Sequence, residues 1–249
     1  MDILPIEPED LDPSSLRAFF YPNEEQTLYW SRSWDPAFYV ALAEAGFISI
    51  SLNHPDLGDL LIPELQDTYA VLDWEHLHVS RHLGKLFRSG RIESEGIELR
   101  VVDDPTAVVA RLLEQHGDPT WLTDRYVELL DRLPKEDGPD FALHGVELWS
   151  RSPERLVAGE LGYAIGRTYT SLSGFHTPDT VDSGRWTRFG TLQMWLLAKR
   201  LEERGFAFWN LGHPEQPYKR ALGAKLLPRA EFLARWLPAQ ADRTANSLR

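Results

Sequence analysis

One run in the second half of the chain decides the fold: Leu156-Val157-Ala158-Gly159-Glu160-Leu161-Gly162-Tyr163-Ala164-Ile165-Gly166. Apolar and small residues follow one another almost without interruption, which is typical of a strand buried on both faces. Gly166 and Arg167 then suit a tight turn into a second strand over residues 168–175. The run therefore predicts a buried β-hairpin.

Patterns on both sides of this hairpin predict further helices and strands. In chain order they are a strand over residues 97–102, helices over 104–116 and 123–133, a loop over 135–139, a strand over 142–149, a helix over 186–204 and a strand over 206–211. Helices and antiparallel strands in separate runs predict an α+β architecture.

The first third of the chain also has helix and strand signals. Its first thirty or so residues are rich in Pro and acid and predict an irregular lead. Asp35 caps a helix that Gly46 ends, and residues 47–51 alternate as a strand does. Ser80 is a good N-cap for a helix that runs to about Arg88.

Composition limits the classes of function. Of the 249 residues, 43% are hydrophobic, which is enough for a sizeable core, and the formal net charge is −12. Such a charge argues against non-specific binding to nucleic acid, because phosphate contacts need Lys and Arg. The absence of cysteine excludes a disulfide framework, a thiolate nucleophile and a Cys-based metal site.

The sequence shows no sign of membrane insertion. No apolar run approaches the ~20 residues that a bilayer span needs. The first residues are acidic, where a signal peptide would be basic. We therefore expect a cytoplasmic protein with no membrane partner.

Two stretches are locally basic despite the net charge. The first contains Arg81, His82, Lys85, Arg88 and Arg91, and the second contains Lys219, Arg220, Lys225 and Arg229. Neither stretch includes an acidic residue. Each is either a patch that binds a polyanion or a solvated helix face.

Several short motifs occur in a defined order along the chain. They are Leu77-His78-Val79-Ser80-Arg81, Thr120-Trp121-Leu122-Thr123, His144-Gly145-Val146-Glu147-Leu148-Trp149, the hairpin run, Leu222-Gly223-Ala224 and Pro228-Arg229. In order and spacing this set, within residues 35–237, resembles the bacterial leucyl/phenylalanyl-tRNA-protein transferases. The resemblance implies aminoacyl-tRNA as a partner and an amine acceptor as the second substrate.

The same resemblance implies a domain organisation. It predicts a Gcn5-related N-acetyltransferase-like domain over residues 89–249, preceded by a small N-terminal α/β domain over residues 1–88. It also implies that the first basic stretch meets tRNA. The side chains expected to do so are Arg81, Lys85, Arg88 and Arg91.

The donor site is predicted partly from a missing motif. A CoA-dependent acyltransferase needs a Gly-rich turn before a helix, and residues 182–190 lack its spacing. The family takes its donor from the 3′-aminoacyl-adenosine of tRNA, so we expect no cofactor.

Trp121 matches a family Trp at the terminal adenosine, where stacking contributes ~1–3 kcal/mol per base. The alternative is a core Trp, and a second family Trp is Ile50 here.

The catalytic positions of the family are altered. A family Glu falls on Leu172, and the family's Asp-Cys-Gln element falls on residues 210–213, within one residue. An amine that attacks an ester must lose a proton, which requires a base of suitable pKa. We therefore propose that His213 replaces the family relay, with Asn210 and Ser173 as hydrogen-bonding support. The alternative is that His213 is a loop residue with no role.

The amino-acid pocket also differs from the family pattern. Glu160 stands where the family strand has an apolar residue that lines a cup for Leu or Phe side chains, and Tyr169, Met194 and Leu197 complete the predicted pocket. A buried, unpaired carboxylate is costly, so we expect Glu160 to face solvent or to meet a cation. If it lines the pocket, the preferred donor carries an amine-bearing side chain.

A metal site is not expected. His76, His78 and His82 are close in sequence, and the last two have helical i,i+4 spacing. However, His78 belongs to one of the family motifs, and no carboxylate ligand is apparent.

The sequence thus predicts an aminoacyl-tRNA-dependent aminoacyltransferase. Because the family Glu and Gln are lost, the acceptor is either a protein N-terminus or a small amine. Two alternatives remain open at this point. One is a non-catalytic protein that binds aminoacyl-tRNA or N-terminal peptides, and the other is an acyltransferase with a different acyl donor.

Overall fold

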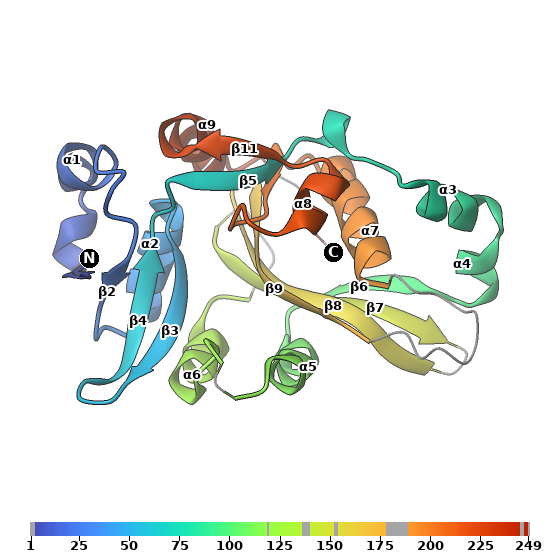
Figure 1. Cartoon of the computed structure of the whole chain (residues 1–249), viewed down its shortest axis with the longest axis horizontal. Coiled ribbons are helices and arrows are strands. Elements are labelled where there is room, and N and C mark those ends of the chain that lie inside the picture. The colour runs from blue at the N-terminus through green and yellow to red at the C-terminus, as the bar shows by residue number, and fades with distance from the viewer. Residues whose placement is uncertain are drawn as a thin grey trace.

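A seven-stranded mixed sheet forms the centre of the molecule (Figure 1). The computed structural model describes residues 3–118, 120–135, 140–151, 154–177, 189–244 and 247–248. The strands, in spatial order, are β11 (Lys225–Pro228), β5 (Thr68–Leu72), β10 (Phe208–Asn210), β9 (Thr168–His176), β8 (Glu154–Ile165), β7 (Ala142–Arg151) and β6 (Glu98–Val102). Neighbouring strands are antiparallel except for β9 and β10, which are parallel.

Helices cover both faces of this sheet. One face packs against α2 (Pro36–Glu44), α5 (Thr106–His116), α6 (Asp124–Arg132) and α9 (Arg229–Ala241), and the other packs against α7 (Phe189–Glu203) and α8 (Pro217–Leu222). Strand alternation divides the core between them. In β5, Tyr69 and Val71 face the first layer, whereas Ala70 and Leu72 face the second. The chain is thus a mixed α/β protein with a large sheet, as the sequence predicts.

The N-terminal segments pack beside the sheet. They contain an antiparallel pair, β3 (Ile48–His54) and β4 (Gly58–Glu64), a parallel pair, β1 (Leu4–Pro5) and β2 (Tyr29–Trp30), and the short helix α1 (Pro13–Ser15) with helical turns over Pro8–Leu11 and Leu16–Phe20. Strand β5 precedes residue 88, yet it pairs with β10 and β11 inside the large sheet. If the chain is divided into two domains, β5 therefore belongs with the C-terminal one.

One buried arginine fastens the N-terminal lead to the rest of the molecule. Arg229 is fully buried at the start of α9. Its guanidinium donates hydrogen bonds to the backbone carbonyls of Phe20, Asn23, Gln26, Leu65 and Gln66. The planar fork of Arg suits several acceptors at once. The predicted irregular lead is therefore held against α9.

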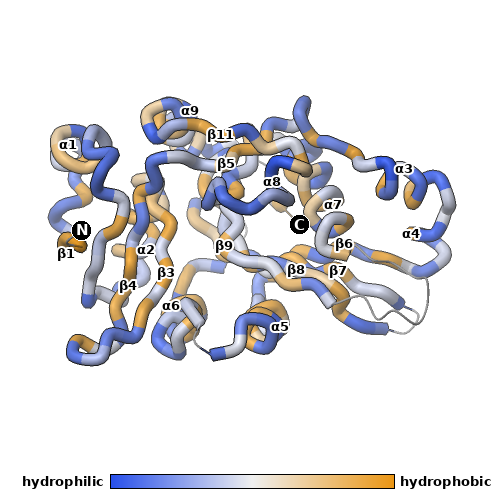
Figure 2. The backbone as a smooth tube through the Cα atoms, viewed as in Figure 1, coloured by the Kyte–Doolittle hydropathy of each residue, from blue (hydrophilic) through white to orange (hydrophobic). Residues whose placement is uncertain are grey.

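Two short helices lie at the opposite end of the molecule from the N-terminal segments (Figure 1). They are α3 (Arg81–Arg88) and α4 (Arg91–Ser94), which follow a helical turn over Trp74–His76. Leu83 and Leu86 of α3 are buried in a cluster that includes Phe189 and Leu192 of α7. The rest of α3 is largely hydrophilic (Figure 2). The helix therefore presents a polar face outward.

Local signals in the sequence are confirmed. Asp35 accepts a hydrogen bond from the Ala37 amide and Ser80 accepts one from Leu83, so each caps its helix as predicted. At Gly166 φ is +54°, and an added Cβ would lie 2.3 Å from the Gln240 carbonyl oxygen, so the hairpin turn requires glycine. Part of the predicted 135–139 loop and the start of the predicted 186–204 helix fall outside the described residues. Across the part of the chain described here, no helix is long and apolar enough to span a bilayer.

Candidate active site

The parallel strands β9 and β10 separate after a short paired stretch. They are in register from Phe208 and Thr168 to Asn210 and Thr170. Beyond Asn210 the chain leaves β9 but stays hydrogen-bonded to β5, where the Leu211 amide donates to the Ala70 carbonyl and the Ala70 amide donates to the Gly212 carbonyl. The second half of β9 continues without β10 as its neighbour. Side chains from both strands and from β4 lie at this end of the sheet.

His213 follows this turn and lies against a carboxylate. Its Nε2 lies 3.0 Å from Oε2 of Glu64, the last residue of β4. The His213 side chain is 49% exposed, whereas that of Glu64 is 14% exposed. A histidine that is accessible to solvent and held by a carboxylate is suited to accept and return a proton. The base predicted from the sequence thus has a partner that the sequence did not indicate.

Asn210 holds the turn that carries His213. It is 1% exposed, and its Oδ1 accepts a hydrogen bond of 3.0 Å from the Gly212 amide. Gly212 has φ of +71°, a left-handed conformation that favours glycine. Lys219 Nζ donates a 2.7 Å hydrogen bond to the His213 carbonyl. Asn210 therefore supports the backbone of the predicted site.

Ser173 has a different partner from the predicted one. In the pairing of β8 with β9, Leu161 lies opposite Ser173 and Gly162 opposite Ser171, so Leu172 is an extra residue in a β-bulge. The bulge turns Ser173 toward α5, where its Oγ lies 3.0 Å from His116 Nε2. Gln115 fastens the same helix end to β9, since its side chain bonds to Gly174 and His176.

Trp121 lies close to this serine–histidine pair. Its ring is half-buried, with its centroid 6.5 Å from that of His116 and 5.4 Å from that of Tyr126. The Trp121 carbonyl accepts a hydrogen bond from the Ser51 amide of β3. The partial exposure is compatible with stacking of a base, although the inner part of the ring belongs to the core.

Glu160 lies on the other face of the sheet, under α7. It is 3% exposed, and its two oxygens accept hydrogen bonds from Ser171 Oγ, at 2.8 Å, and Gln193 Nε2, at 3.2 Å. Trp209 Nε1 donates in turn to Ser171. Burial raises the pKa of Glu160 to about 7, and these hydrogen bonds oppose the rise. Two neutral donors thus bind the carboxylate, and a positive charge also acts on it.

The nearest charge that acts on this carboxylate belongs to Lys219. Burial lowers the pKa of Lys219 to about 8, and the charge of Glu160 opposes the shift. We call Glu160, Ser171, Gln193 and Lys219 the buried carboxylate cluster. It joins β8, β9, α7 and α8 beside the place where β9 and β10 separate.

The other predicted pocket residues also lie on the α7 face. Tyr169 and Leu197 are fully buried, and Met194 packs against the same cluster as a partly buried side chain. An added Cβ at Gly162 would lie 2.3 Å from the Tyr169 hydroxyl, so glycine leaves the room that this ring needs. The predicted pocket residues therefore lie on the α7 side of the sheet, whereas Trp121 packs with the opposite helical layer.

The two basic stretches differ in how far their side chains are exposed to solvent. Arg81, Lys85 and Arg88 are exposed on α3, and Arg91 forms a 2.9 Å ion pair with Glu95. In the second stretch Lys219 is 6% exposed and Arg229 is fully buried. The second stretch is therefore not a continuous surface patch, while α3 keeps an exposed basic face.

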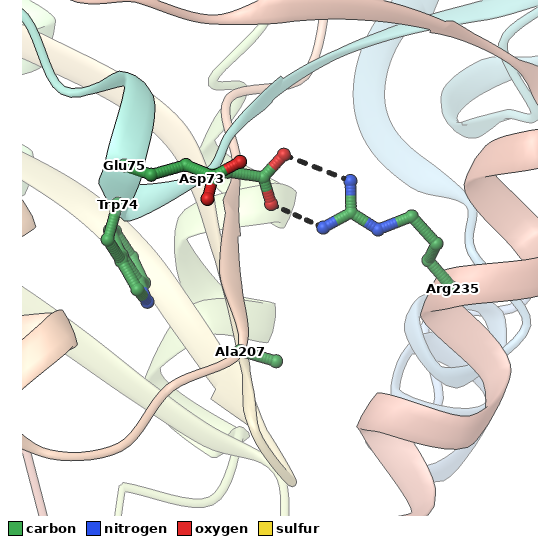
Figure 3. A pocket seen from close by; sticks show the side chains of 5 residues that line it. All are labelled: Asp73, Trp74, Glu75, Ala207 and Arg235. Atoms are coloured by element: carbon green, nitrogen blue, oxygen red, sulfur yellow. Dashed lines mark hydrogen bonds and ion pairs between the residues drawn. The ribbon is translucent and has the colours of Figure 1, made fainter.

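A hollow of about 500 Å³ lies at the other end of β10 (Figure 3). Trp74 and Ala207 line it, and Arg235 reaches across to the Asp73 carboxylate through two ion-paired contacts. Arg235 also stacks over the Phe208 ring, 4.7 Å from its centroid. The hollow is separated from His213 by the length of β10.

Sequence reasoning missed two residues of the site. Glu64 ends a strand that the sequence analysis did not predict, and no motif links it to His213. His116 was identified only as the end of a helix. Its place next to Ser173 depends on the bulge at Leu172. Across the part of the chain described here, no group of three or more His, Asp or Glu residues is arranged to hold a metal ion.

The described residues thus include an exposed histidine beside a carboxylate, a half-buried tryptophan and an exposed basic helix. A sequence profile of the family described as leucyl/phenylalanyl-tRNA protein transferase matches residues 71–236. The chain belongs to this family, as its motifs predicted.

Individual relatives support the assignment. A leucyl/phenylalanyl-tRNA–protein transferase of Ectopseudomonas mendocina (strain ymp) is 31% identical over 198 residues, which cover 72% of this chain and 78% of the relative. One of the same name from Rubrobacter xylanophilus is 27% identical over 170 residues, with coverages of 68% and 78%.

The solved structures are less similar to this chain in sequence than these relatives are. The crystal structure of FemX gives a TM-score of 0.45 at 12% identity, covering 90% of this chain and 76% of FemX. The structure of L-PGS from Bacillus licheniformis gives 0.39 at 14% identity, with coverages of 82% and 58%. Because both TM-scores are below 0.5, the family assignment stands on the sequence matches alone.

Proposed function

We propose that the protein transfers an aminoacyl group from tRNA to an amine at the end of the sheet where β9 and β10 separate, with His213 as the proton acceptor. The family sets the class of reaction: the protein is an aminoacyl-tRNA-dependent aminoacyltransferase. The observation that carries the assignment of the base is the 3.0 Å contact between His213 and Glu64. It supplies an accessible base where Leu172 and the altered 210–213 segment leave the family groups unmatched.

The reaction proceeds by attack of the amine on the ester carbonyl. A C–N bond forms, the amine proton passes to His213, and the C–O bond to the 3′ oxygen of the terminal adenosine breaks. His213 then returns the proton to that oxygen, which gives an amide and free tRNA. The contribution of the protein is to position the two reactants and to supply the base.

We assign the terminal adenosine to Trp121 and the tRNA backbone to the basic face of α3. The half-exposed Trp121 ring offers one stacking surface. Arg81, Lys85 and Arg88 are exposed and can neutralise phosphates, while Arg91 has Glu95 as a partner. This arrangement explains how an acidic chain binds RNA through one limited region.

The donor amino acid and the acceptor remain to be chosen among a few candidates. The relatives are named for leucyl- and phenylalanyl-tRNA and for a protein acceptor, so these substrates come first in a test. The prediction that Glu160, Tyr169, Met194 and Leu197 contact the donor side chain adds lysyl- and arginyl-tRNA. A Glu160→Met variant with unchanged donor preference would count against that prediction.

We further propose that the C-terminal part has a Gcn5-related N-acetyltransferase-like architecture beside a smaller N-terminal unit. The parallel β9–β10 pair, which separates inside an otherwise antiparallel sheet, supports this architecture. Because the donor is aminoacyl-tRNA, we place the enzyme in the cytoplasm, where charged tRNA is made and used.

Acceptor-dependent release of tRNA tests the function. Each aminoacyl-tRNA is incubated with the protein, with and without a peptide bearing a free N-terminus or a small primary amine. We expect deacylated tRNA and a new amide only when an amine is present. Protection of the ester without product would indicate a binding protein. If the protein neither deacylated nor protected any aminoacyl-tRNA, the acyl donor would be a different one.

A further inference from the structure

We infer that Glu64 is a positioning residue for this transfer: it holds the imidazole of His213 so that Nε2 keeps its hydrogen and Nδ1 receives the proton of the attacking amine. The inference rests on the proposed function, since it assigns a partner to the proposed base. It also gives the N-terminal segments a part in the chemistry, because Glu64 comes from β4 and His213 from the turn after β10.

The backbone of Glu64 is fixed on both sides. Glu64 pairs with Ile48 in the β3–β4 ladder and forms a bridge with Leu28. The next residue, Leu65, donates its amide to Thr27 and its carbonyl accepts from the buried Arg229. The carboxylate therefore extends from a rigid support, with 14% of the side chain exposed.

The backbone of His213 is fixed by three further contacts. The Gly212 amide donates to Asn210 Oδ1, the Gly212 carbonyl accepts from the Ala70 amide, and the His213 carbonyl accepts from Lys219 Nζ. What these contacts leave undetermined is the rotation of the ring. The Glu64 carboxylate, 3.0 Å from Nε2, supplies that last restraint.

This geometry selects one tautomer. A carboxylate beside Nε2 favours hydrogen on that nitrogen, which leaves the lone pair on Nδ1 as the acceptor. When Nδ1 takes the amine proton, the imidazolium lies against the Glu64 carboxylate. This is the usual relation of a base to the group that orients it.

Other charges around the pair come from several elements. Lys219 of α8 reaches the His213 carbonyl, Glu215 is exposed two residues along the same turn, and Tyr69 of β5 lies near enough to Glu64 to sense its charge. Burial raises the pKa of Tyr69 well above its ordinary value, so it stays neutral in the working range. Glu215→Gln removes a nearby carboxylate that does not contact the imidazole and is the matched control.

The experiment compares Glu64→Met, Glu64→Gln, His213→Ala and the Glu64→Met/His213→Ala double variant. Single-turnover transfer and steady-state KM are measured, with thermal melting to verify folding. We expect Glu64→Met to lower kcat by roughly 10–100-fold with KM nearly unchanged. Glu64→Gln, which keeps an acceptor oxygen, should retain more activity, and Glu215→Gln should match wild type. The double variant should be no slower than His213→Ala alone.

A second readout does not depend on activity. Nitrogen-15 NMR of the His213 ring should show the Nε2–H form in the wild-type protein and a mixture of the two tautomers in Glu64→Met. Full activity together with an unchanged tautomer in Glu64→Met would overturn the inference. If His213→Ala alone abolished transfer, the proposed function would survive that result. Absence of amine-dependent transfer by the wild type would instead contradict the proposed function, whatever the tautomer.

Discussion

The His213–Glu64 pair and the buried carboxylate cluster around Glu160 both combine an acid with a potential base, yet water reaches them very differently. His213 is 49% exposed, whereas Glu160 is 3% exposed and both of its oxygens accept hydrogen bonds from neutral side chains. In our proposal, this exposed histidine exchanges a proton with the substrate. The buried carboxylate cluster instead joins two strands and two helices. The two groups therefore differ in solvent exposure and in the number of hydrogen bonds that the carboxylate accepts, more than in residue type.

The largest effect should come from removing the base of the His213–Glu64 pair. His213→Ala should slow transfer roughly 100–10,000-fold, because general acid–base catalysis contributes about that much. The rate is measured in single-turnover reactions with saturating aminoacyl-tRNA. His54→Ala, on the β3–β4 hairpin, serves as the control and should keep the wild-type rate. A rate within a few-fold of wild type for His213→Ala would place the chemistry elsewhere.

The buried carboxylate cluster should control how stability depends on pH. Burial raises the pKa of Glu160 to about 7, so between its ordinary value of 4.5 and 7 the folded protein holds a proton that the unfolded chain releases. Stability is therefore lost as the pH rises through this window, by about 3 kcal/mol. Urea unfolding at pH 4.5, 5.5 and 7 measures it.

Glu160→Gln should remove this dependence of the unfolding free energy on pH, that is, its slope against pH, because the amide does not titrate. Glu154→Gln, at the exposed start of the same strand, is the matched control and should keep the wild-type slope. Equal slopes in Glu160→Gln and wild type would show that the carboxylate is already ionised at low pH.

An intermediate effect is expected at Trp121. Trp121→Ala should weaken binding of a stable aminoacyl-adenosine amide by ~1–3 kcal/mol, which is the usual contribution of one stacked base. Trp121→Phe keeps an aromatic face and should lose less. Calorimetric titration of both variants gives the comparison. Equal affinities for Trp121→Ala and wild type would show that this ring serves the core alone.

The smallest effect should appear on α3. Lys85→Gln and Arg88→Gln should each weaken tRNA binding a few-fold and reduce the slope of log affinity against log salt by roughly 1. Lys199→Gln, whose side chain pairs with Glu202, should leave the slope unchanged. Affinity and slope that stay at wild-type values in both α3 variants would remove this helix from the tRNA site.

Much of the fold could be predicted because its signals are local. The caps at Asp35, Ser80 and Thr123 act within a few residues of their helices, and each is found in the structure. The hairpin at Gly166 follows from a strand pattern and a turn residue that are adjacent in sequence. Strand β5, by contrast, was not predicted, because both of its neighbours come from the last fifth of the chain.

The site was less predictable because its contacts are long-range. His213 could be proposed from the family register, but its partner Glu64 lies on a different strand pair far away in the sequence. A single bulge at Leu172 decided the direction of Ser173, since one extra residue reverses the face of every residue that follows it. Arg229, part of a basic stretch in the sequence, is buried among carbonyls from two separate segments, residues 20–26 and 65–66.

Chemical rescue is the most direct test of the claim that His213 takes the proton. Free imidazole is added to His213→Ala during single-turnover transfer, with wild type measured alongside. Since the side chain is half-exposed, a small base has access to the space it leaves. We predict that imidazole raises the rate of His213→Ala in proportion to its concentration and leaves wild type unchanged. Transfer by His213→Ala at the wild-type rate without imidazole would contradict the account.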